Sequence, residues 1–147
     1  TTLCDALAQV GFNAIYENLG TNPFLDDCFR DPASFRFPSQ MWFVLSKFHE
    51  IKKFERPGSL NVVDQSVMNV RAYTNMLFRH EDPQGFAVIE KCFEYLEGRL
   101  GAPDMLVDLR CSAPEQLRRI RNRNRDHERD VDIHYIESLQ QEIDLLL

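Results

Sequence analysis

The stretch LNVVDQS, residues 60–66, is a short apolar run that ends in an acidic residue, an amide and a hydroxyl. β-Branched and apolar side chains bounded by polar residues are typical of a buried β-strand. Two other runs, FNAIY (12–16) and MLVDLR (105–110), have the same character. Segments with helical spacing of apolar residues separate these runs. The sequence therefore predicts an α/β fold with a mainly parallel sheet flanked by helices.

Apolar residues at helical spacing predict five helices. The first carries its apolar residues between positions 3 and 10 and ends at Gly11, a residue suited to a helix C-cap. The others are expected at about 34–54, 67–76, 86–96 and 133–143. At 147 residues, the length predicts a single domain over residues 1–147.

Composition excludes several classes of function. No apolar run is long enough to span a membrane. The net charge of −6 argues against general nucleic-acid binding, so the six arginines between Arg118 and Arg129 are expected to act locally, as a solvated helix face or a lid over phosphates. The four cysteines are scattered without a C-x-x-C motif, which favours reduced thiols in a cytoplasmic or organellar interior over zinc or disulfides.

Charged residues follow each predicted strand. Glu17 comes after the first strand, Asp64 after the second, and the arginine-rich segment after the third. Ligand groups gather at the carboxyl ends of parallel strands. Any one of these acids could simply cap a helix, but two carboxylates facing several arginines suit phosphoryl transfer, which needs a base, a metal ligand and neutralising charge.

The sequence opens with TTLCDAL, which is predicted to begin a helix. A hydroxyl residue at the start of a helix would fit the last position of a phosphate-binding loop. In the pattern G-x-x-x-x-G-K-[ST], the final hydroxyl residue begins a helix and contacts magnesium. Thr1 would be that residue, and the glycines and lysine would lie upstream of the sequence given.

Along essentially all of its length the sequence resembles the deoxynucleoside kinase family, especially its bacterial deoxyadenosine/deoxyguanosine branch. The matching segments are YENLGTNPFLDDCFRDP (16–32), FRFPSQMWFVLSKF (35–48), DQSV (64–67), GAPDMLVDLRCSAPEQLRRIRNRNRDHE (101–128) and IHYIESLQQEID (133–144). The resemblance implies transfer of the γ-phosphate of ATP to the 5′-hydroxyl of a deoxynucleoside, with a purine as the expected base, in nucleotide salvage. It also implies a P-loop kinase-like fold with an arginine-rich lid. The central phosphate-loop strand and the last strand lie outside the sequence given, so we expect a chain truncated at both ends.

The resemblance assigns roles in catalysis and in ATP binding. Glu17 matches the general base that accepts the proton of the 5′-hydroxyl. Asp64, with Thr1, would hold Mg²⁺. Arg119, Arg123 and Arg125 match the lid arginines that clamp the phosphates of ATP, and Glu128 falls in the same ATP-binding lid.

Substrate contacts are implied in the same way. Gln40 matches the glutamine that reads the edge of the nucleobase, and Phe24 and Trp42 would wall the nucleoside pocket, although both could equally pack in the core. Lys47 and Gln65 occupy positions where relatives have arginines near the substrate. Lysine keeps the charge but loses the bidentate fork.

Two departures support an alternative function. Gln65 lacks the cation that relatives place beside the transferring phosphate, and Val70 replaces an acid that helps to read the base. The alternative is a catalytically silent relative that acts as a subunit in protein assembly. The resemblance further implies a homodimer in the cytoplasm or the mitochondrial interior, with a deoxynucleoside as substrate and ATP and Mg²⁺ as cofactors.

Overall fold

The computed structural model describes every residue except 1, 18, 126, 127, 129 and 130. Helix α1 (Thr2–Gln9) leads into strand β1 (Asn13–Ile15). Gly11, at φ 100°, makes the left-handed turn between them, which confirms it as the residue that ends the first helix. The order then continues with the 3₁₀ turn η1 (Leu19–Thr21), α2 (Leu25–Arg30), α3 (Pro32–Phe54), β2 (Asn61–Val63), α4 (Val67–Phe78), α5 (Pro83–Leu100), α6 (Ala113–Arg123) and α7 (Ile133–Leu146).

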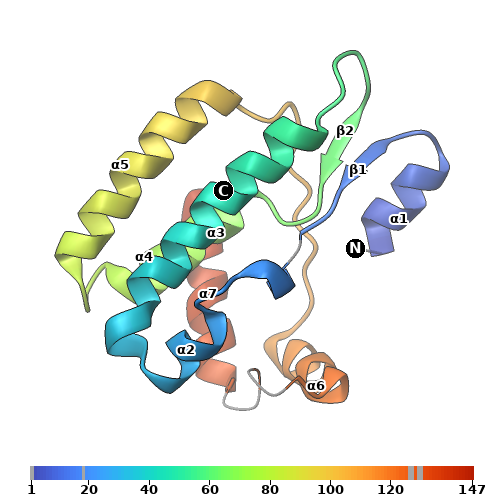
Figure 1. Cartoon of the computed structure of the whole chain (residues 1–147). Helices are drawn as coiled ribbons and strands as arrows, with labels where there is room; N and C mark the ends of the chain where they lie inside the picture. Colours follow the sequence, from blue (N-terminus) through green and yellow to red (C-terminus); the bar gives the residue numbers. More distant parts are fainter. Residues whose placement is uncertain (1, 18, 126–127, 129–130) are drawn as a thin grey trace.

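The two strands form a parallel pair, as the sequence predicts. Asn13 lies opposite Asn61, and Ile15 lies opposite Val63. The backbone N–H of Asp64 donates to the Ile15 carbonyl at 2.8 Å, so the pairing continues to the residue that follows β2. Helix α1 packs against both strands, whereas α3 contacts β1 (Figure 1). Both strands therefore end next to α3, which places Glu17 and Asp64 beside that helix.

The prediction of a third buried strand at 105–110 is wrong. This segment is extended, but it pairs with no strand among the described residues. Met105 is 78% exposed and Leu109 is 72% exposed. Branched apolar composition favours a strand only where a neighbour supplies the backbone hydrogen bonds, and the described part of the sheet consists of β1 and β2. The segment serves instead as the connection from α5 to α6 (Figure 1).

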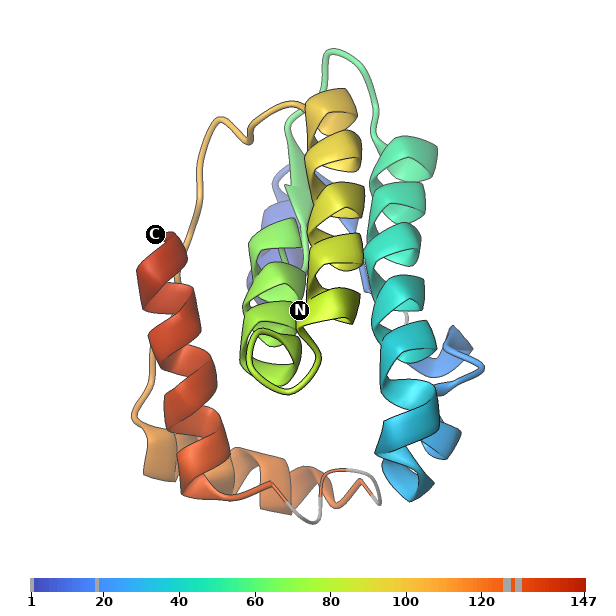
Figure 2. The ribbon, with the colours of Figure 1, turned by 90° about the vertical axis from the view of Figure 1, so that its left-hand side faces the viewer.

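The hydrophobic core lies among α3, α4 and α5, which contact one another in pairs and stand side by side in Figure 2. Its buried members are Val44, Val70, Phe78, Ile89 and Phe93. Helix α7 packs on α4, and α6 packs on α7. All five predicted helices are present. No helix in the described ranges has the length and hydrophobicity that a membrane span requires.

Short polar side chains fix where the site-bearing helices begin. Asp31 caps α3 by accepting a hydrogen bond from the Ser34 N–H at 3.3 Å, and a proline follows it at the first helical position. Ser66 caps α4 in the same way, through the Asn69 N–H at 3.3 Å. Because a side-chain oxygen at the N-cap satisfies a free N–H of the first turn, each helix starts at a defined residue. The N-cap of α4 is thus fixed two residues after Asp64.

Candidate functional site

Glu17 lies just beyond the end of β1 and faces a lysine on α3. Lys47 Nζ is 3.8 Å from Glu17 Oε1 and 3.1 Å from Glu50 Oε2, and it donates a hydrogen bond to the backbone carbonyl of Asp64 at 3.3 Å. The exposed fractions of the Lys47, Glu17 and Glu50 side chains are 3%, 13% and 10%. One buried cation therefore joins two carboxylates of different elements to the end of β2.

Burial raises the pKa of Glu17 above its ordinary value. The charge of Lys47 opposes this shift, whereas the carboxylates of Glu50 and Asp64 add to it. Withdrawal from water disfavours the charged form of an acid, and a single nearby cation here offsets that only in part. A carboxyl whose pKa rises toward neutrality is a better proton acceptor for an alcohol than one at its ordinary value.

Asp64 follows β2 directly, and its side chain is half-buried at the carboxyl end of the parallel pair. Its charge influences both Glu17 and the Cys4 thiol, so its carboxylate lies on the side of the sheet where α1 and Glu17 meet. No group of three or more acidic, cysteine or histidine side chains within the described ranges could hold a metal by itself. Magnesium bound to a nucleotide uses one or two carboxylates and takes its other ligands from phosphates and water, so Asp64 suits that ion as a single ligand.

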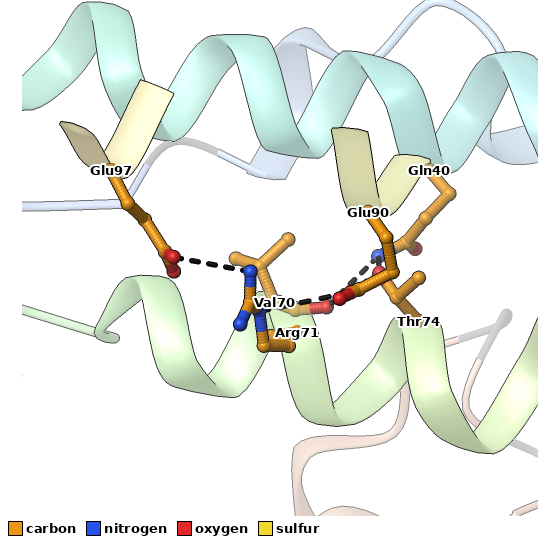
Figure 3. Close-up of polar contacts among 6 residues, drawn as sticks. All are labelled: Gln40, Val70, Arg71, Thr74, Glu90 and Glu97. Carbon is orange, nitrogen blue, oxygen red and sulfur yellow. Dashed lines mark hydrogen bonds and ion pairs between the residues drawn. The ribbon is translucent and has the colours of Figure 1, made fainter. Parts of the chain in front are cut away.

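Gln40 is buried on α3, at 5% exposure, and faces α4 (Figure 3). Its amide nitrogen donates to the backbone carbonyl of Val70 at 3.1 Å and to the Thr74 hydroxyl at 2.8 Å. Gln40 and Lys47 are seven residues apart, which is two helical turns, so they share one face of α3 at a separation of about 10 Å. This separation is comparable to the length of a nucleoside from its 5′ end to the far edge of its base.

Near Gln40, an ion-pair cluster joins α4 to α5 (Figure 3). Arg71 Nη2 is 3.1 Å from Glu97 Oε2, and Arg71 Nε is 3.7 Å from Glu90 Oε1. Its guanidinium carbon lies 4.9 Å from the centre of the Phe93 ring. These contacts hold α4 against α5, on the side of α4 next to the residues that face Gln40.

Tyr73 on α4 connects the Glu17 region to the arginine-rich segment. Burial, first of all, raises the pKa of its phenol, and the charges of Glu17 and Glu128 raise it further, whereas the charge of Arg123 lowers it. Glu17, Arg123 and Glu128 therefore all lie within electrostatic range of the buried Tyr73 phenol, because charges are screened less in a buried setting.

The predicted lid arginines are paired with acids of their own segment. Arg123 Nη2 and Arg125 Nη1 each lie 3.4 Å from Glu128 Oε1, whereas Glu128 Oε2 is buried and accepts no hydrogen bond from the described residues. Asn124, in the left-handed region at φ 49°, ends α6 between the two arginines. The resulting turn lets both guanidinium groups reach the same carboxylate.

Arg119 is held differently from the other two predicted lid arginines. Its Nε donates to Glu115 Oε1 at 2.7 Å, one turn earlier on α6, and Arg118 makes two hydrogen bonds to the same carboxylate. These hydrogen bonds lower the pKa of Glu115 to about 2. The exposed fraction of the Arg119 side chain is 64%, so it extends from the surface of α6 and is not gathered with Glu17.

Gln65 lies between Asp64 and the cap of α4 with φ 61°, in the left-handed region that residues other than glycine rarely adopt. It is exposed. Backbone strain of this kind is concentrated at functional sites because surrounding structure must hold it in place. The position that departs from the family pattern is therefore also the one where the strand-to-helix turn is strained.

The predicted pocket walls are half-buried. Phe24 begins α2, and its N–H donates to Asn22 Oδ1 at 3.0 Å, while Asn22 Nδ2 donates to the Ser39 hydroxyl at 3.0 Å. These bonds place Phe24 near the part of α3 that carries Gln40. Trp42 packs edge-on against Phe43, with 5.5 Å between ring centres. Thr1, the predicted magnesium ligand, lies outside the described residues.

Sequence reasoning missed three residues of this site: Glu50, Tyr73 and Thr74. Each is a polar residue within a helix, a position that is more often solvated than buried. Glu50 had one detectable signal, its i,i+3 spacing from Lys47, which allows a pair on one helix face. Nothing in the spacing of Tyr73 or Thr74 marks them.

Comparisons with known proteins identify the family and the fold. The family model described as deoxynucleoside kinase matches residues 1–146. A deoxyadenosine kinase from Dictyostelium discoideum is 28% identical over 142 residues, which is 95% of this chain and 58% of the relative. A deoxyguanosine kinase from Bacillus subtilis is 27% identical over 146 residues, 95% of this chain and 68% of the relative. The chain thus spans less than two thirds of the Dictyostelium protein.

A solved structure has the same fold. The deoxyadenosine kinase of M. mycoides, determined with products dCMP and a flexible dCDP bound, superposes with a TM-score of 0.80 at 16% identity. The superposition covers 99% of this chain and 76% of that one. The two-stranded sheet and its helices therefore form part of a P-loop kinase-like α/β fold.

Proposed function

This chain belongs to the deoxynucleoside kinase family, and from that premise we propose that its protein transfers the γ-phosphate of ATP to the 5′-hydroxyl of a purine deoxynucleoside. The observation that carries the proposal is the position of Glu17. Its side chain is nearly buried just beyond the end of β1, and its pKa is raised. Its partner Lys47 lies on α3, the helix that also carries Gln40. Gln40 and Lys47, the residue that contacts Glu17, lie about 10 Å apart along α3, which is comparable to the length of one nucleoside.

The reaction assigns a different task to each part of the site. The Glu17 carboxylate accepts the proton of the 5′-hydroxyl as its oxygen forms a bond to the γ-phosphorus, while the bond from that phosphorus to ADP breaks. Arg123 and Arg125 exchange Glu128 for the phosphates of ATP, and Arg119 approaches from the same helix. Phe24 and Trp42 exclude water around the sugar and the base.

Magnesium is part of the proposal, with Asp64 as the residue of the described chain that would hold it and Thr1 as the second candidate. When bound, the ion would neutralise charge on the phosphates and fix their orientation. Lys47 lies too deep to replace it, because its amino group is already occupied by two carboxylates and a carbonyl.

The resemblance also supports proposals about the protein's setting. We propose a homodimer, which light scattering on the purified protein tests directly. A cytoplasmic location, or the mitochondrial interior, is consistent with four free cysteines.

The test of the function is formation of a deoxynucleoside monophosphate from ATP and a panel of deoxynucleosides. Glu17→Gln keeps the shape of the side chain but accepts no proton, so turnover should fall about 10²–10⁴-fold. The affinity for the nucleoside, measured by calorimetry, should change little. Glu94→Gln is the matched control, because Glu94 is an exposed helical glutamate whose ion-pair partner among the described residues is Lys91. No product with any deoxynucleoside, or full turnover in Glu17→Gln, would overturn the proposal.

A further inference from the structure

Three oxygen atoms surround the Lys47 ammonium at unequal distances. Its Nζ lies 3.1 Å from Glu50 Oε2 and 3.3 Å from the Asp64 carbonyl oxygen, but 3.8 Å from Glu17 Oε1. A charge-assisted hydrogen bond between an ammonium and a carboxylate is about 2.7–2.9 Å long. Lys47 therefore acts on Glu17 as a nearby charge, because the distance between them is too long for a hydrogen bond.

Glu50 is tied to Lys47 by the geometry of α3 itself. The two residues have i,i+3 spacing, which places their side chains on one face of the helix. Glu17, by contrast, belongs to the segment that follows β1. The Lys47 and Glu50 side chains are 3% and 10% exposed, so water screens their attraction little. The Glu50 carboxylate and the Asp64 carbonyl together keep the ammonium at its longer distance from Glu17.

This distance matters if Glu17 is a general base. A hydrogen bond from Lys47 would stabilise the charged form of the Glu17 carboxylate and make it a weaker proton acceptor. It would also occupy a lone pair that could accept the proton of the 5′-hydroxyl. The two neighbours act on the pKa of Glu17 in opposite directions, since the charge of Lys47 lowers it and the charge of Glu50 raises it. Glu50 thus opposes the loss of basicity that a closer lysine would cause.

We propose that Glu50 is a positioning residue that holds the Lys47 ammonium beyond hydrogen-bond distance of Glu17. The Glu17 carboxylate then stays available for the proton of the 5′-hydroxyl. This inference rests on the proposed function, in which Glu17 is the general base. Glu50 acts through Lys47 and does not itself touch the substrate.

Glu50→Gln tests this geometry, because the amide keeps the shape of the side chain and loses its charge. Of the two carboxylates that pair with Lys47 among the described residues, Glu17 then remains. Crystal structures of the full-length parent and variant, both without ligand, measure the result. In the variant, the distance from Nζ to the nearer Glu17 oxygen should shorten to about 2.7–2.9 Å. If it stays at 3.8 Å, Glu50 does not set the position of Lys47, and the proposal is overturned.

Glu55→Gln is the matched control for charge removal. Glu55 forms an i,i+3 pair with Lys52 at the same distance of 3.1 Å, but both of these side chains are 38% exposed. The control should therefore leave the distance from Lys47 to Glu17 and the turnover unchanged. A loss of turnover as large as that of Glu50→Gln would indicate a general effect of removing an acid from this part of the chain, and it would contradict the proposal.

Turnover and affinity separate the positioning role from a purely structural one. Glu50→Gln should lower kcat about three- to tenfold, because a hydrogen bond from Lys47 weakens Glu17 as a proton acceptor. The affinity for the nucleoside, measured by calorimetry, should stay within about twofold of the parent value. A structural role would lower affinity and turnover together. That result, or an unchanged kcat despite the shorter distance, would overturn the proposal.

The crystallographic distance does not depend on activity, so it separates this inference from the proposed function. If the distance shortens in Glu50→Gln but the parent protein phosphorylates no deoxynucleoside, the proposed function fails, and the role of Glu50 in catalysis fails with it. If the parent is active and the distance is unchanged in the variant, the inference about Glu50 fails while the proposed function stands.

Discussion

Replacing Lys47 with methionine removes a buried cation and keeps most of its volume. Its Nζ lies 3.8 Å from one Glu17 oxygen and 3.1 Å from one Glu50 oxygen. At an effective dielectric constant of about 20, these separations correspond to gross attractions of about 4 and 5 kcal/mol. Lys47 is 3% exposed, so much of this attraction offsets the cost of burying the charges.

The net change in the free energy of unfolding depends on the charges that remain after the substitution. Two nearly buried carboxylates would remain without their shared cation, and breaking a buried pair in this way costs about 3–5 kcal/mol. We expect Lys47→Met to lower the free energy of unfolding by at least about 3 kcal/mol at a pH where both carboxylates are ionised.

The loss should depend on pH, because the pKa of Glu17 is raised above its ordinary value. A raised folded-state pKa contributes stability that is fully present below the ordinary value and is lost as pH rises through the folded-state pKa. Lys47 opposes the shift, so its removal raises the pKa of Glu17 further and steepens the loss on the alkaline side. The destabilisation should therefore be larger near about pH 8 than near about pH 5.

Urea unfolding followed by circular dichroism measures this difference. The matched control is Lys52→Met on the same helix, since Lys52 has a 38% exposed side chain and pairs with Glu55 at the surface. The control should change the free energy of unfolding by less than about 0.5 kcal/mol. Adding Glu17→Gln to Lys47→Met should recover part of the loss. If Lys47→Met were no less stable than Lys52→Met, or if its loss were the same at both pH values, the reasoning from the buried cluster would be refuted.

Three further predictions concern the turn after β2 and the arginine-rich segment. Gln65→Gly should raise the free energy of unfolding by about 0.5–1 kcal/mol in thermal or urea unfolding, because glycine adopts φ 61° without strain; Gln65→Ala should give no gain, and an equal gain for alanine would argue against strain. Glu128→Gln should lower the KM for ATP a few-fold, because the carboxylate competes with phosphates for two partly exposed guanidinium groups; an increased KM would mean that Glu128 binds the nucleotide. Arg119→Ala should raise the pKa of Glu115 from about 2 in an NMR titration, since it removes one of the hydrogen-bond donors that lower it; an unchanged pKa would contradict that contact.

The helices could be predicted from sequence because their signal is local. Apolar spacing gave all five expected helices, and Gly11 marked the end of the first. The strands were harder, since a strand is completed by a neighbour that the local sequence does not specify. Residues 13–15 pair with residues 61–63 in a parallel sheet. Residues 105–110 have a similar apolar composition but pair with no strand in the described structure.

The residues of the candidate site also differ in whether the sequence alone predicts them. Glu17 and Asp64 could be proposed from their positions after strands, because the topology of a parallel sheet brings strand ends together. Lys47 could be named only through family resemblance, and then as a substrate contact and not as the partner of Glu17; Glu50 was missed although its i,i+3 spacing from Lys47 allows a pair. Whether a helical glutamate is buried depends on which helix face meets the sheet, and that is decided by packing among α3, α4 and β1.

Gln65 is unusual both in its side chain and in its backbone conformation. In the sequence it is a missing guanidinium beside the transferring phosphate, which predicts slow turnover. In the structure it is also a strained backbone position between the proposed metal ligand and the cap of α4. Gln65→Arg therefore changes charge while leaving the strain in place, and Gln65→Gly relieves the strain without adding charge. If turnover rises only in Gln65→Arg, electrostatics limits the reaction; if it rises in Gln65→Gly alone, the geometry of the turn does.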